Sequence, residues 1–169
     1  MSSNSIGTED GYVLEPQGEH RVTIVWLHDV HENSYKVQRG YDYRYYAQDC
    51  RDELDSAAVR VANILSTEPE NVIKGVGGVG QGAQVALNFA KWNAVGDHTM
   101  NMRLVIGINS WFEPSIPLYF AKETAVSLID DGFGEVSFVQ FRMLGREITV
   151  NVLKKVEVWL NGKLPLDPN

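Results

Sequence analysis

The sequence predicts an α/β fold around a mainly parallel sheet, and three observations support that prediction. Segments with strand composition alternate with segments whose apolar residues recur at helical spacing along the 169-residue chain. Two of the strand-like segments, Arg21–Leu27 and Arg103–Ile108, are apolar on both faces, as expected of strands that helices cover on both sides. A glycine-rich turn joins one of these strands directly to a helix. Together these features favour parallel strands linked by right-handed crossovers.

The first part of the chain is expected to hold a tail, a strand, a loop and a helix. Residues 1–10 are polar and lack the basic and apolar regions of a signal peptide, so we expect a disordered tail before one domain at residues 11–169. A β-rich apolar run predicts a strand at Arg21–Leu27. Asp29–Cys50, which holds five tyrosines, is expected to be a long irregular loop. Helical spacing of apolar residues predicts a helix at Asp52–Ser66.

The rest of the chain continues the alternation of strands and helices. The expected elements are a strand at Val72–Val76, a helix at Ala83–Ala94, a strand at Arg103–Ile108, a helix at Leu118–Asp131, a strand at Glu135–Phe141 and a final helix at Glu147–Leu160. This order favours a parallel sheet, because each crossover between neighbouring strands contains a helix.

Composition and charge exclude several classes of function. The chain has a net charge of -7 and a pI of about 5.0, so nucleic acid and anionic membranes are not expected partners. Its longest apolar runs have the length of strands and are too short to cross a bilayer. Cys50 is the only cysteine, which excludes an internal disulfide and suits a reducing compartment, so a cytoplasmic location is expected.

The glycine cluster between the second strand and the second helix has three possible interpretations. Gly75–Gly80 has the spacing of the dinucleotide motif G-x-G-x-x-G, but it does not follow the first strand, and Asp97 falls in a loop instead of closing a second strand. A P-loop needs Lys-Ser or Lys-Thr after the last glycine, and Ala83-Gln84 follows instead. Gly78–Gly82 has the spacing of the nucleophile elbow G-x-S-x-G, with glycine at the central position.

Several segments around this cluster resemble one known family. They are V-W-L-H at residues 25–28, L-S-T-E-P at 65–69, the glycine cluster with its alanine at 75–83, R-L-V-I-G-I-N-S-W-F at 103–112, G-F at 132–133, M-L-G-R at 143–146 and W-L at 159–160. In this combination they are similar to plant carboxylesterase-like acyl-protein thioesterases, which are α/β-hydrolases. The resemblance extends over about residues 22–160 and implies an α/β-hydrolase-like three-layer sandwich.

The resemblance also implies that the domain at residues 11–169 is truncated. The family has a long insert between its first matching strand and the L-S-T-E-P helix, and here only the tyrosine-rich stretch stands in that place. A family strand that precedes Ile116-Pro117 is missing, as if Ser110–Ser115 were a junction. The mainly parallel sheet is therefore expected to be one or more strands short.

The resemblance places degenerate residues at the catalytic positions. Gly80 stands in the place of the nucleophilic serine and has no side chain, while Arg146 stands in the place of the histidine and stays protonated at neutral pH. Glu113 matches the acid only by its offset, because the residues before it match a different strand. The backbone amides of Val30 and Gln81 match a vestigial oxyanion hole.

The resemblance therefore implies an inactive carboxylesterase or acyl-protein thioesterase-like protein. Any remaining role is expected to be binding, either of a small lipid or ester or of a protein partner. The alternative is a weakly active esterase or thioesterase with a rebuilt site. No cofactor is expected, and no metal either, because His28, His31 and Glu32 fall in a loop and not on a helix.

A truncated sheet has a consequence for association. Without its neighbouring strand, Arg103–Ile108 is expected to leave an apolar edge, unless Glu135–Phe141 pairs with it directly. An open apolar edge favours the addition of a strand from another chain. We therefore expect a homodimer with a contact near Trp111–Pro117.

Overall fold

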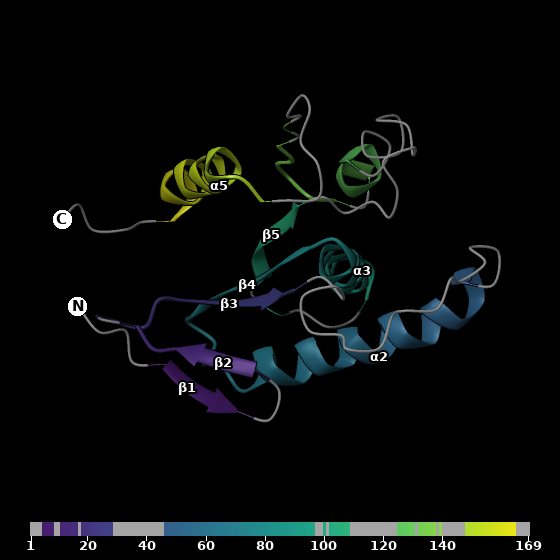
Figure 1. Cartoon of the computed structure of the whole chain (residues 1–169), viewed down its shortest axis with the longest axis horizontal. Coiled ribbons are helices and arrows are strands. Elements are labelled where there is room, and N and C mark those ends of the chain that lie inside the picture. The colour runs from purple at the N-terminus through teal and green to yellow at the C-terminus, as the bar shows by residue number, and fades with distance from the viewer. Residues whose placement is uncertain are drawn as a thin grey trace. The chain divides into compact units, whose positions relative to one another are not determined.

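In the computed structural model, the chain forms two compact units, Met1–Phe112 and Glu113–Asn169 (Figure 1). The structure describes residues 5–8, 11–16, 18–28, 46–96, 100, 102–108, 125–130, 132–137, 139 and 148–164. The elements are β1 (Ser5–Thr8), β2 (Gly11–Leu14), β3 (Val22–Leu27), α2 (Tyr46–Ser66), β4 (Ile73–Val79), α3 (Gln81–Val95), β5 (Met102–Ile108) and α5 (Val150–Lys163). Each unit is considered by itself.

A parallel three-stranded sheet organises the first unit. Its strand order is β3-β4-β5, so each strand pairs with the next one along the chain. Right-handed crossovers in one direction place both connecting helices on the same face, and α2 and α3 pack against each other there (Figure 1). The predicted mainly parallel α/β sheet is therefore confirmed.

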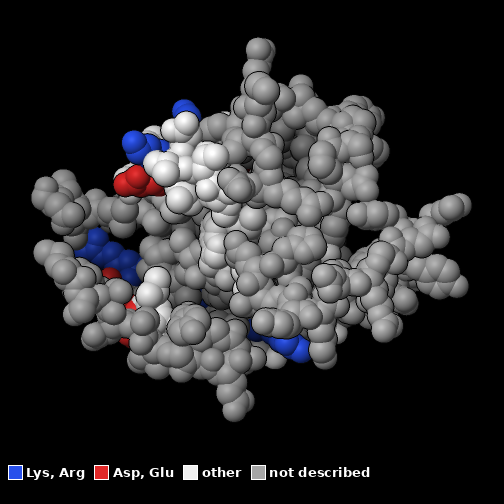
Figure 2. Space-filling view, in the orientation of Figure 1, with Lys and Arg blue, Asp and Glu red and all other residues white. Residues whose placement is uncertain are grey.

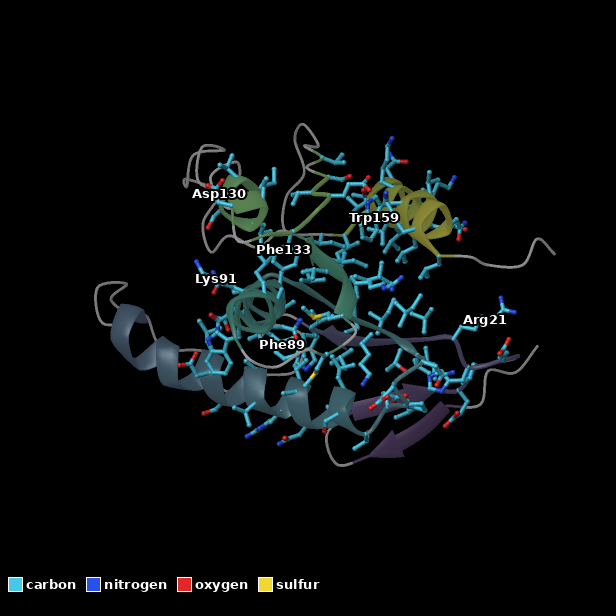
Figure 3. The ribbon with its side chains drawn as sticks, turned by 180° about the vertical axis from the view of Figure 1, so that it is seen from behind. Arg21, Phe89, Lys91, Asp130, Phe133 and Trp159 are labelled. Atoms are coloured by element: carbon cyan, nitrogen blue, oxygen red, sulfur yellow. The ribbon has the colours of Figure 1, made fainter. Side chains whose placement is uncertain are left out.

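The core of the first unit lies between this sheet and its two helices. Its buried side chains come from α2, α3 and the central strand and are Ala58, Val61, Leu65, Val76, Ala86 and Phe89. Figure 3 shows Phe89 between α3 and α2. Val25 and Val105 from the outer strands pack against this cluster in register with Val76, so all three strands contribute to one apolar face.

The opposite face of the central strand carries glycines where larger side chains would not fit. Gly77 lies in register between Trp26 and Ile106. A Cβ atom on Gly77 would lie 2.7 Å from two ring carbons of Trp26 and 3.2 Å from Cβ of Ile106. The indole of Trp26 therefore lies over the backbone of β4 in the space that a side chain at residue 77 would take.

Most predicted elements of the first unit are confirmed, and two expectations are corrected. The residues expected to form a disordered tail include β1, which pairs with β2 in an antiparallel two-stranded sheet. The helix expected from Asp52 begins at Tyr46, so the end of the tyrosine-rich stretch is helical and not irregular. The remainder of that stretch, residues 29–45, lies outside the described part. The expectation of a single domain stays a prediction.

The second unit contains α5 and a short helix at residues 125–130, which falls within the predicted helix Leu118–Asp131. The strand predicted at Glu135–Phe141 is wrong where the structure describes it, because residues 135–137 and 139 form no strand. Glu135 instead forms an ion pair with Lys163, in the last turn of α5, and accepts a hydrogen bond from its Nζ. Figure 2 shows acidic and basic side chains side by side in the upper left, where Figure 1 shows α5.

The packing of Trp26 over Gly77 predicts a specific coupling between these residues. Gly77→Ala should lower the free energy of unfolding by about 1–3 kcal/mol, because the added methyl overlaps the indole. In the Trp26→Ala background the same substitution should cost less, since the overlapping ring is gone. Denaturant unfolding of the four proteins in this cycle measures the difference. Equal effects of Gly77→Ala in both backgrounds would contradict the proposed contact.

Candidate functional site

The junction between β4 and α3 is a sharp turn at one glycine. β4 ends at Val79, α3 begins at Gln81, and Gly80 between them has φ 57° and ψ -118°. L-residues with a side chain rarely adopt this conformation, whereas glycine adopts it without steric cost. The turn therefore has the sharp strand-to-helix geometry that a nucleophile elbow requires.

Backbone hydrogen bonds show how Gly80 joins the sheet to the helix. Its N–H donates to the carbonyl oxygen of Ile108 at 2.9 Å, which continues the pairing of β4 with β5. Its carbonyl oxygen accepts from the N–H of Gln84 at 3.3 Å, which begins the hydrogen-bonding pattern of α3. The N–H of residue 80 thus belongs to the sheet and its C=O belongs to the helix. The chain changes direction between them.

The two flanking glycines of the turn are required by close backbone contacts. A Cβ atom on Gly78 would lie 2.4 Å from the carbonyl carbon of Gly82. A Cβ atom on Gly82 would lie 2.4 Å from the carbonyl oxygen of Leu27 and 2.7 Å from that of His28. The first turn of α3 is therefore in contact with the carboxyl end of β3, and the spacing G-x-x-x-G has a direct steric cause.

The structure places two of the predicted site residues together and leaves three undescribed. Gly80 and Gln81 are consecutive, and the amide of Gln81 lies at the amino end of α3, where the helix dipole favours negative charge. Val30, Glu113 and Arg146 lie outside the described residues. A hydroxyl at residue 80 is the group that this turn would present to an acyl carbon, and glycine supplies none.

The geometry also separates the elbow from the dinucleotide motif that the same glycines match. In that motif the first glycines form the tight turn after a strand and allow the pyrophosphate to approach the backbone. Here Gly75, Gly77 and Gly78 lie inside β4, paired on both sides by β3 and β5. Only Gly80 lies in the turn, so the dinucleotide interpretation fails.

Another cluster of polar side chains, which sequence analysis did not identify, lies at the opposite end of the strands. Nε2 of His20 is 2.7 Å from Oγ1 of Thr23 and 3.4 Å from Oε2 of Glu68. His20 precedes β3, whereas the elbow follows β4, so the two sites are separated by the length of a strand, about 20 Å. His20 is therefore no candidate for a base at residue 80. No sequence motif relates these three residues.

The described residues offer neither a metal site nor a membrane-spanning helix. These residues contain no group of three or more histidine, cysteine, aspartate or glutamate side chains that could hold a metal ion. None of their helices is both long and apolar enough to cross a membrane. His28 follows β3 directly, beside Gly82, while His31 and Glu32 lie outside the described part of the chain.

The fold belongs to the α/β-hydrolase-like class, as a comparison with solved structures shows. The crystal structure of Zea mays acyl-protein thioesterase 2 superposes with a TM-score of 0.69. The two sequences are 22% identical, and the match covers 88% of this chain and 96% of the maize chain. No protein-family model matches the sequence, and no curated protein matches it either.

The comparison confirms the predicted fold class. At 22% identity it shows the fold alone, so the activity of the maize enzyme is not transferred by it. The truncation of the sheet stays a prediction, and so does the loss of the triad. Within the described residues, the geometry of the turn and the residue at its centre are the features that bear on chemistry.

Steric contacts at the turn predict unequal effects of glycine-to-alanine substitutions. Gly82→Ala should lower the free energy of unfolding by about 3 kcal/mol or more, because backbone atoms of β3 and α3 must separate. Gly107→Ala is the matched control, since its Cβ would meet Leu87 and Ala83 at 3.7–3.8 Å, an ordinary contact distance. That variant should be as stable as the parent or more so. Thermal and denaturant unfolding compare them, and a well-tolerated Gly82→Ala would contradict the close approach.

Proposed function

We propose that this protein is an inactive member of the acyl-protein thioesterase-like hydrolases that binds ligands without turning them over. One observation carries the proposal: the turn at Gly80 has the geometry of a nucleophile elbow but no nucleophile. The fold match to a thioesterase supports the family, and the geometry of the turn supports the position. A fold that retains the turn for a nucleophile but lacks the nucleophile itself is expected to bind ligands without reacting with them.

The chemistry of acyl transfer explains why this one position is decisive. Serine hydrolases need a hydroxyl that attacks the acyl carbon, a histidine that removes its proton and an acid that orients the histidine. Glycine at residue 80 removes the attacking atom itself. If Arg146 occupies the position of the histidine, the base is lost as well, because a guanidinium stays protonated. Either loss alone would be enough to prevent acyl transfer.

A binding role remains compatible with the residues of the turn. An oxyanion hole consists of backbone amides, which do not depend on the identity of the side chains. Gln81 directly follows the turn as the first residue of α3. We propose that its amide and that of Val30 supply the two donors of such a hole. A small lipid or ester would then be held by its carbonyl group without being cleaved. We further propose a cytoplasmic location, as the single cysteine suggests.

The first expected outcome is the absence of turnover. Purified protein should not hydrolyse short-chain nitrophenyl esters or palmitoyl thioesters above the buffer rate, because residue 80 offers no nucleophile. It should also remain unlabelled by a fluorophosphonate probe, which requires an activated serine. An active thioesterase processed in parallel controls for the reagents. Stoichiometric labelling of any serine, mapped by mass spectrometry, would support the alternative of a weak esterase with a rebuilt site.

The second outcome concerns restoration of the hydroxyl. Gly80→Ser alone should remain inactive, since members of a catalytic triad act as a unit and one restored member recovers little rate. The variant should also lose about 1–3 kcal/mol of stability, because a side chain is strained at φ 57°. Gly80→Ala serves as the control for strain without a hydroxyl. Burst kinetics with a nitrophenyl ester in Gly80→Ser, absent in Gly80→Ala, would show that a base is still in place.

A further inference from the structure

We draw no further inference here: the strongest candidate, the side-chain cluster of His20, Thr23 and Glu68 at the amino end of the parallel strands, beside the buried Lys74 of β4, carries nothing further because no described residue shows what such a cluster would bind.

Discussion

The first unit depends on a close approach of backbone at the turn between β4 and α3. Gly82 in the first turn of α3 lies against the carbonyl groups of Leu27 and His28, and Gly78 lies against Gly82. These contacts fix the start of the helix against the carboxyl ends of two strands. Because α3 also packs on β5, the position of this turn decides how the helix lies on the sheet. The apolar core between α2, α3 and the strands forms behind it.

Such a turn separates the support of a catalytic group from the group itself. The conformation of Gly80 is stabilised by hydrogen bonds on both sides, one to the sheet and one within the helix. None of these bonds involves the side chain of residue 80. Loss of a serine at this position would therefore leave the fold intact and would relieve strain, since glycine adopts a positive φ freely. The side chain at residue 80 can therefore change without loss of the hydrogen bonds that hold the turn.

Sequence patterns predicted the parallel sheet and its helices because burial on both sides leaves a strong signal. The strands around Val25 and Val105 are apolar runs, and the helix after Asp52 has an apolar stripe. The β1–β2 hairpin left no such signal, since its strands are four residues long and include Gly7 and Gly11. Its order comes from pairing between the two strands, which composition does not reveal.

Alternation of polar and apolar residues predicts a strand from Glu135, but residues 135–137 and 139 form none. The residues that follow have the period of a half-buried strand, but a strand also needs a neighbour to pair with. In the second unit Glu135 bonds to Lys163 of α5, and no described residue pairs with this segment as a strand. Period alone therefore indicates which side chains can share a face. It does not indicate whether a sheet is available to receive them.

The glycine cluster shows why the candidate site was only partly predictable. Glycines at residues 77, 78 and 80 look equivalent in the sequence, but each is required for a different reason. Gly77 makes room for Trp26 of the neighbouring strand, Gly78 for the backbone of α3, and Gly80 for a positive φ. The first two reasons depend on register and packing, which only the fold supplies. A spacing motif records that small residues are needed, so two motifs could match the same cluster. The backbone angle at one residue distinguishes them, because a nucleophile elbow turns at its central position whereas a dinucleotide motif turns at its first glycines.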